Sequence, residues 1–221
     1  MPNDLHIALQ QYYAGDDGLT EAEVDGYRAD ALRDGVVYEI QTGSFTAIRD
    51  KLRKLARKHP VVLVYPVPET KFIARLDPET GEQLSCRRSP KRGRPADVFD
   101  ELLYTRNALR SENLSLEVVM TVERELRCDD GLGSWWRKGV SIRGRELLAI
   151  VGRHRFDTPA DLLKLLPEDL PERFTVADLA AGMGLYKRVA GRVAWTLRKL
   201  GAIRKVSKRG HAYVYRRVAP R

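Results

Sequence analysis

Apolar residues recur along the chain with two different periods, which predict helices and strands. Residues 5–14 and 44–59 carry apolar side chains at helical spacing, and the second segment has lysine and arginine on its other faces. Residues 24–32 and 36–42 are rich in β-forming side chains and are joined by an Asp-Gly turn, a hairpin signal. Residues 61–65 form a continuous apolar run, typical of a strand buried on both faces. The order helix, strand, strand, helix, buried strand predicts an α/β core.

The middle of the chain continues this mixture of elements. A hairpin is expected across residues 71–88, and a helix over 95–109. Residues 115–126 alternate between apolar and polar, which predicts a half-buried strand. Residues 129–145 are rich in glycine and basic residues, so we expect a connector there, followed by a short helix over 144–154.

The last third of the chain predicts two helices and a hairpin. Residues 174–184 are expected to form a short helix capped by Thr175, and a glycine turn leads into a longer basic helix over 185–203. Two strand-like runs then flank an Arg-Gly turn. Helix, glycine turn and longer helix form the helix-turn-helix pattern, and with the hairpin residues 165–218 resemble a winged helix.

The chain is basic, which points to an anionic partner. Its formal net charge is +9 and its pI about 9.7, and lysine and arginine bind polyanions by displacing counterions from phosphates. The alternative is a solvated basic surface on a protein with another role. Cys86 and Cys128 stand far apart in no paired motif, so we expect neither a zinc site nor a disulfide.

The apolar runs and the first residues give an expectation about location. The first residues lack the basic stretch and long apolar core of a signal peptide. The longest apolar stretch, residues 61–67, is far too short to cross a bilayer. We expect a cytoplasmic protein with no membrane partner. The oligomeric state stays open, a homodimer included.

Basic side chains gather where a winged helix meets DNA. On the longer helix they face away from the apolar stripe, where they can reach phosphates or guanine edges in a major groove. A basic loop over residues 87–95 offers further phosphate contacts. The predicted DNA-binding residues are Arg87, Arg88, Lys91, Arg92, Arg94, Arg188, Arg192, Trp195, Lys199, Lys208 and Arg209. The alternatives are a winged helix that contacts only proteins, and a Trp195 that packs beneath the hairpin.

Acidic and amide side chains converge on the predicted hairpin of the first third. Asp30 lies on one strand, and Glu39 and Gln41 lie on its partner, where residues two apart point to the same face. Carboxylate and amide oxygens at such a point suit Mg²⁺ or Mn²⁺. A metal ion held there polarises a phosphodiester and lowers the pKa of an attacking water.

This arrangement resembles the core of the PD-(D/E)XK nucleases, which include Holliday-junction resolvases and restriction enzymes. The resemblance covers residues 5–66 and rests on an Asp-bearing strand, a hairpin, a Glu-X-Gln strand, a helix and a buried strand. It implies that Asp30 and Glu39 bind the metal ion. It also implies that Gln41 stands at the position of the family's lysine.

Gln41 departs from the family pattern because glutamine is neutral and lysine is a cation. Some members move the lysine to the next helix, where Lys51 is the candidate, and the alternative is a solvated helix lysine. Glu23 is the candidate for the additional acid that many members carry, and the alternative is ordinary loop acidity. His6 is expected to be a helix-face residue.

The sequence therefore predicts a mixed-sheet α/β core like that of restriction endonucleases, joined to a C-terminal winged helix. The expected domains are a nuclease-like domain over 1–128, a basic connector over 129–145 and the winged helix over 146–221. The expected function is Mg²⁺- or Mn²⁺-dependent cleavage of duplex or branched DNA. The alternatives are a non-catalytic DNA-binding regulator with a degenerate nuclease fold, and a protein-interaction adaptor.

Overall fold

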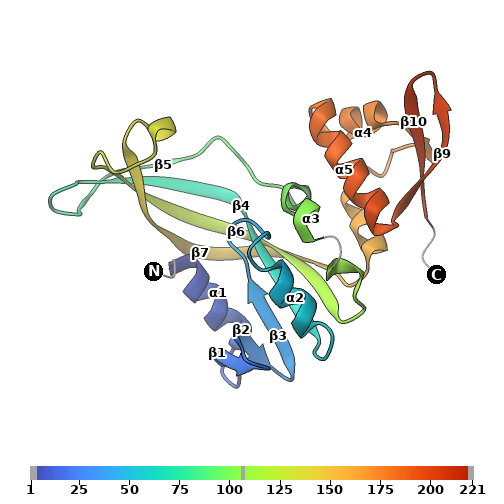
Figure 1. The fold of residues 1–221 in the computed structure, drawn as a ribbon. Helices are drawn as coiled ribbons and strands as arrows, with labels where there is room; N and C mark the ends of the chain where they lie inside the picture. The colour runs from blue at the N-terminus through green and yellow to red at the C-terminus, as the bar shows by residue number, and fades with distance from the viewer. Residues whose placement is uncertain (1–3, 106–107, 219–221) are drawn as a thin grey trace.

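The computed structural model describes residues 4–105 and 108–218, and its architecture is mixed α/β (Figure 1). In these residues seven strands form one mixed sheet in the order β1-β2-β3-β4-β6-β7, with β5 paired to β4. The α-helices are α1 (Asp4–Ala14), α2 (Arg49–Leu55), α3 (Phe99–Thr105), α4 (Val176–Met183) and α5 (Lys187–Leu200). Short 3-10 helices lie at Pro95–Val98, Ala108–Arg110, Trp135–Arg137 and Pro159–Leu165.

Two Asp-Gly turns fold the first three strands into an antiparallel meander. These strands are β1 (Leu19–Val24), β2 (Tyr27–Arg33) and β3 (Val36–Ile40). Asp25 and Gly26 have φ values of 49° and 75°, and Asp34 and Gly35 have values of 52° and 74°. Left-handed values at both turn positions are those of a type I′ hairpin. The predicted hairpin between the second and third strands is confirmed, and β1 is an additional strand in a polar segment.

Parallel strands form the centre of the sheet and carry its core. The remaining strands of this sheet are β4 (Val61–Leu76), β5 (Gln83–Arg88), β6 (Leu114–Asp129) and β7 (Val140–Phe156). β4 runs parallel to β3 on one side and to β6 on the other. Val62 and Val64 pack against α1, and Val61 and Leu63 pack in the core on the side of α2 and α3. The prediction of a strand buried on both faces is confirmed.

Several expectations for the middle of the chain are wrong. Residues 144–154 form part of β7 and not a helix, and the connector expected over 129–145 is a β-hairpin whose second strand begins at Val140. β6 is buried on both faces, because Glu117, Glu123 and Glu125 are buried as well as its apolar residues. Helix α2 begins at Arg49 and not at Ser44. Residues 106 and 107 of the helix predicted over 95–109 lie outside the described residues.

The C-terminal elements follow the predicted order of helix, helix and hairpin. The strands are β8 (Arg173–Phe174), β9 (Ile203–Arg209) and β10 (Ala212–Arg217), paired in the order β8-β10-β9. Thr175 caps α4 by accepting hydrogen bonds from two backbone amides, and Gly184 ends the helix in the left-handed conformation. These elements share one continuous apolar core with the α2–α3 face of the large sheet. In Figure 1 they form one end of the molecule, and the tip of the β6–β7 hairpin lies at the other.

Candidate active site

Asp30 lies where β2 and β3 part. The backbone pairing of the two strands ends at Ala31 with Tyr38. Beyond that pair, the Asp30 side chain takes the place of a backbone partner for β3. Its Oδ2 accepts a hydrogen bond from the Ile40 amide at 2.7 Å, and its Oδ1 lies 3.2 Å from His6 Nε2 of α1. The carboxylate is therefore fixed at the carboxyl end of β3.

Glu39 is buried beneath α2 and meets a lysine there. Its side chain is 1% exposed, and its Oε2 lies 2.6 Å from Nζ of Lys51. Lys51 also donates to the carbonyl oxygen of Arg28 on β2. The Oε1 atom of Glu39 is buried and has no hydrogen-bond partner among the described residues. A buried carboxylate oxygen without a partner is costly, so this position favours a cation.

The two carboxylates ionise differently. Burial raises the pKa of Glu39 to about 7, against the lowering effect of the Lys51 ammonium, and the negative charge of Asp30 adds to the rise. Burial would also raise the pKa of Asp30, but hydrogen bonds from His6 and the Ile40 amide outweigh it, and the pKa is lowered. Carboxylate pairs whose pKa values are pushed apart are typical of active sites.

Three polar residues that the sequence analysis did not assign to the site surround Asp30. His6 and Gln10 lie one turn apart on α1, and the Gln10 Nε2 atom donates to Asp30 Oδ1 at 3.3 Å and to Glu21 Oε1 at 2.6 Å. Glu21 has a φ of 57° and lies between Thr20 and Ala22, which pair with Ala31 and Ala29 on either side of Asp30. The spacing of four between His6 and Gln10 places both on one face of α1, and this signal was available in the sequence.

Glu39 and Lys51 are in direct contact, whereas Asp30 is held from the α1 side and influences that pair only through its charge. The two other predicted residues lie elsewhere. Gln41 Nε2 donates to the carbonyl oxygen of Ser44 at 2.8 Å and so braces the loop that follows β3. Glu23 is exposed on β1, and Glu21 takes part in the hydrogen bonds around Asp30 instead. We refer to Asp30, Glu39 and Lys51 as the acidic site.

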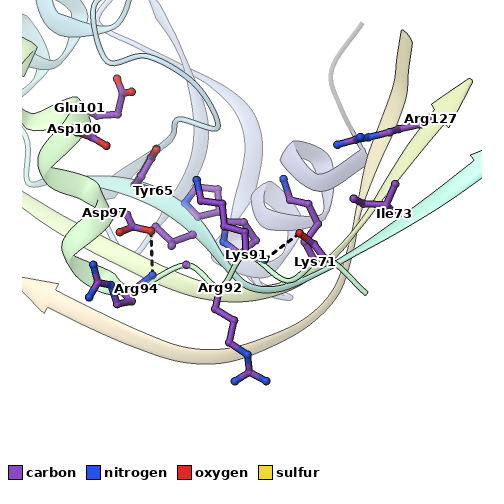
Figure 2. Close-up of a pocket in the computed structure, with 15 residues that line it drawn as sticks. Tyr65, Lys71, Ile73, Lys91, Arg92, Arg94, Asp97, Asp100, Glu101 and Arg127 are labelled. Atoms are coloured by element: carbon purple, nitrogen blue, oxygen red, sulfur yellow. Dashed lines mark hydrogen bonds between the residues drawn. The ribbon is translucent and has the colours of Figure 1, made fainter. Parts of the chain in front are cut away.

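A pocket of 530 Å³ opens along β4 just beyond the end of β3. The last β3–β4 pair is Ile40 with Val64, and Tyr65 is the next residue and lines the pocket. Loop 89–94 closes the other side, held by a hydrogen bond from the Gly93 amide to the Pro68 carbonyl at 2.9 Å. In Figure 2 the side chains of Lys71, Lys91 and Tyr65 extend to the same side of the strands, and Arg92 points away.

The basic residues predicted to form one loop lie in three different settings: the exposed strand β5, the pocket, and a contact inside the protein. Arg87 and Arg88 are exposed on β5. Lys91 and Arg92 line the pocket. The Arg94 guanidinium donates to the Met183 carbonyl at the end of α4, 2.9 Å away, so this arginine joins the loop to the C-terminal elements.

The basic residues of α5 also divide into exposed and paired groups. Arg188 and Lys199 are exposed. Arg192 lies 3.0 Å from the Asp100 carboxylate of α3, so part of α5 faces the large sheet unit rather than solvent. Trp195 is half-buried, with Lys199 Nζ 5.7 Å from the centre of its ring.

The hairpin after α5 presents its cations to solvent. Lys208 and Arg209 are exposed on β9. Lys205 and Lys208 place their Nζ atoms 3.2 and 5.3 Å from the centre of the Tyr213 ring on β10. Aromatic contacts of this kind hold a cation over the ring face.

Neither a cluster of metal-ligating side chains nor a membrane-spanning helix occurs in the described part of the chain. Among residues 4–105 and 108–218, no three His, Cys, Asp or Glu side chains are grouped closely enough to ligate a metal ion by themselves. Within the same described residues, no helix is both long and apolar enough to span a membrane.

Comparison with known proteins places the chain in a family. The family model described as "Domain of unknown function (DUF8091)" matches residues 3–157, which end one residue after β7. An "Uncharacterized protein" of Treponema pallidum (strain Nichols) is 34% identical over 218 residues, covering 98% of this chain and 85% of that protein. No solved structure matches the chain. The chain therefore belongs to the DUF8091 family.

Proposed function

We propose that this member of the DUF8091 family is a nuclease that cleaves DNA phosphodiesters with Mg²⁺ or Mn²⁺. The observation that carries the proposal is the contact of 2.6 Å between Lys51 Nζ and the buried Glu39 carboxylate, whose pKa is also raised by the charge of Asp30. An antiparallel meander, a helix and a strand parallel to the third strand surround this contact. The same order of elements and the same residue types underlie the resemblance to PD-(D/E)XK nucleases.

The side chains of the acidic site fit a hard divalent cation. Mg²⁺ is commonly held by one or two carboxylates, with water and substrate phosphate oxygens completing its shell. Asp30 and Glu39 would supply the carboxylates, so the lack of a three-residue ligand group among the described residues is compatible with such a site. When bound, the cation polarises the phosphodiester and makes water a better nucleophile at neutral pH.

The remaining residues of the site hold the Asp30 carboxylate in place or stabilise negative charge on the substrate. Lys51 carries the positive charge that the family's lysine normally provides, and it reaches the site from α2 instead of β3. Its ammonium stabilises the negative charge that develops on phosphate oxygens during cleavage. His6 and Gln10 hold the Asp30 carboxylate in place from α1. Gln41 braces the loop between the site and the pocket.

The C-terminal elements would position the DNA. Helix α5 and the β9–β10 hairpin resemble a winged helix, and their exposed cations include Arg188, Lys199, Lys208 and Arg209. Lys91 in the pocket would then contact phosphates near the site of cleavage. Phosphate contacts of this type make affinity fall as salt rises.

One observation favours a second candidate, a DNA-binding regulator without catalysis. Lys51 already neutralises Glu39 through a close ion pair, which is also how a degenerate site would be stabilised. The two candidates differ in metal binding, because a regulator has no need of Mg²⁺ or Mn²⁺ affinity that depends on Asp30 and Glu39.

The test is cleavage of linear and branched DNA in Mg²⁺ or Mn²⁺ by the wild type and four variants. Glu39→Gln and Lys51→Ala should each reduce cleavage by at least about a hundredfold, a typical loss for an electrostatic catalytic group. Gln41→Lys should not raise activity, because it adds a second cation beside Lys51. Lys54→Ala is the matched control, since Lys54 is an exposed lysine on the same helix.

Calorimetric titration with Mn²⁺ separates the candidates further. The nuclease should bind Mn²⁺, and Glu39→Gln should weaken that binding without weakening DNA affinity. A wild type that binds DNA but neither cleaves it nor binds Mn²⁺ favours the regulator. A Glu39→Gln protein that cleaves as fast as the wild type refutes the assignment of the acidic site.

A further inference from the structure

Two tryptophans stand exposed at the tip of the β6–β7 hairpin. Trp135 and Trp136 are 76% and 84% exposed, and the neighbouring Leu132 is 78% exposed. The two indole rings are 4.1 Å apart between centroids and almost perpendicular to each other. Large aromatic side chains normally gain stability by burial, so this exposure needs a reason other than folding.

The hairpin tip is held in a defined shape by its own hydrogen bonds. The Asp130 carboxylate accepts from the Leu132 amide at 3.0 Å and from Ser141 Oγ at 2.6 Å, and it pairs with Arg143 at 2.6 Å. Gly133 leaves no room for a Cβ atom, because the backbone of the returning strand passes directly against it. The tryptophans are therefore presented on a preorganised turn, which lowers the ordering cost of binding.

The surroundings of the tryptophans are cationic. Arg137 and Lys138 follow them directly and are exposed. The tip of the β4–β5 hairpin lies at the same end of the sheet, since Leu76 at the end of β4 pairs with Cys128 near the end of β6. Arg75 near the end of β4 and Arg143 on β7 add to the positive charge at this end, although each pairs with an aspartate there. Aromatic faces beside a basic surface are the combination that binds single-stranded nucleic acid.

The size of the apolar tip argues against a protein partner. A stable protein–protein interface involves roughly 20–30 residues on each side, whereas the exposed apolar residues here are two tryptophans and one leucine. Three side chains are enough to stack on one or two bases, because every base offers an aromatic face.

We propose that Trp135 and Trp136 form a stacking platform for unpaired bases of a DNA substrate. This inference rests on the proposed function, and it assigns the substrate class: DNA with a single-stranded segment, such as a fork, a flap or an open end. The duplex portion would lie on the winged-helix-like end, and the unpaired strand would lie on the hairpin at the opposite end (Figure 1).

Fluorescence anisotropy of labelled oligonucleotides tests the platform. The full-length protein is titrated in EDTA against a single strand, a forked duplex and a blunt duplex. Replacing both Trp135 and Trp136 with Ala should weaken binding of the single strand and the fork at least about tenfold, which corresponds to about 1.4 kcal/mol. Binding of the blunt duplex should change less than about twofold, a difference too small for a lost stacking contact.

Two matched variants separate stacking from general loss of apolar surface. Leu132→Ala removes an equally exposed side chain from the same tip and should leave all three affinities unchanged. Replacing both tryptophans with Phe keeps aromatic faces and should retain most of the single-strand affinity. Circular dichroism of each variant checks that the hairpin and the core remain folded.

Several results would overturn the platform. One is unchanged single-strand affinity in the double Ala variant, and another is an equal loss with Leu132→Ala. A third is a tryptophan blue shift with anionic vesicles of phosphatidylglycerol but none with single-stranded DNA, which would assign the tip to membranes. Because binding is measured in EDTA, a failure of the nuclease proposal appears in cleavage and Mn²⁺ titrations and leaves this test intact.

Discussion

A buried carboxylate kept for metal binding should destabilise the protein when no metal ion is present, and Glu39 provides the means to measure this. Its pKa is raised by burial from 4.5 to about 7. The folded state therefore binds this proton more tightly than the unfolded state does, and the free energy of unfolding falls as pH rises through the interval between the two values. At about 1.4 kcal/mol per pKa unit, the full effect is about 3 kcal/mol.

The perturbation is Glu39→Gln, which keeps the shape of the side chain and removes its ionisation. Between pH 4.5 and 8 the wild type should lose about 3 kcal/mol of unfolding free energy relative to the variant. The comparison of the two proteins cancels the titration of other groups that the substitution leaves undisturbed. The assay is urea unfolding at a series of pH values in EDTA, with the unfolding free energy taken from linear extrapolation.

Glu125 supplies a control of opposite sign. It is also buried, but ion pairs with Arg127 and Lys71 outweigh the effect of burial and lower its pKa. Its charge therefore stabilises the fold above the unfolded-state pKa and loses that contribution as pH falls. Glu125→Gln should destabilise the protein at neutral pH, and the difference from the wild type should shrink in acid.

Added metal ions should change the unfolding free energy of the wild type more than that of Glu39→Gln. Mg²⁺ or Mn²⁺ that binds only the folded state raises the unfolding free energy by mass action, about 2.7 kcal/mol at a concentration 100 times Kd. This gain should appear in the wild type at pH 8 and be reduced in Glu39→Gln. Parallel stability curves for the two proteins across the pH range would refute the reasoning, because Glu39 would then ionise as an ordinary glutamate.

Other predictions follow from single contacts. Gly93→Ala should cost about 1–3 kcal/mol of stability, since its Cβ would lie 2.6 Å from the Pro68 carbonyl oxygen; an unchanged melting temperature would show that the loop moves freely. Arg188→Ala should leave the melting temperature unchanged, weaken duplex binding and reduce the slope of affinity against salt by about one phosphate contact. Arg192→Ala should instead lower the melting temperature, since it breaks the pair with Asp100, and thermal unfolding distinguishes the two arginines.

The elements that follow local rules could be predicted from the sequence. Both central features of the first third, the Asp-Gly hairpin and the apolar run at residues 61–65, are confirmed. Lys51 could be named as a candidate because it lies on the helix after Glu39, but its contact with that residue depends on how α2 packs over β3. The side-chain distance is a property of the fold and not of the local pattern.

The elements that were missed depend on partners distant in sequence. β1 is exposed along most of its length, so its sequence lacks a clear alternation of buried and exposed residues. The Asp25-Gly26 turn that follows it is the local signal for this strand. Residues 144–154 form a strand because β6 offers its whole length for antiparallel pairing, and tertiary context of this kind overrides local preference. The burial of Glu125 follows from cations on β4 and β7 that the pattern of β6 alone cannot reveal.

The contacts between the C-terminal elements and the large sheet constrain how a DNA substrate would be held. Arg94 and Arg192 join loop 89–94 and α3 to α4 and α5, and a continuous apolar core lies behind them. The pocket beside Lys91 lies between these contacts and the acidic site along β4. A duplex bound by α5 and the β9–β10 hairpin would therefore approach the acidic site at a spacing set by packed side chains rather than by a flexible linker. Such an arrangement favours recognition of substrate shape, with the cleavage point defined by distance from the bound duplex.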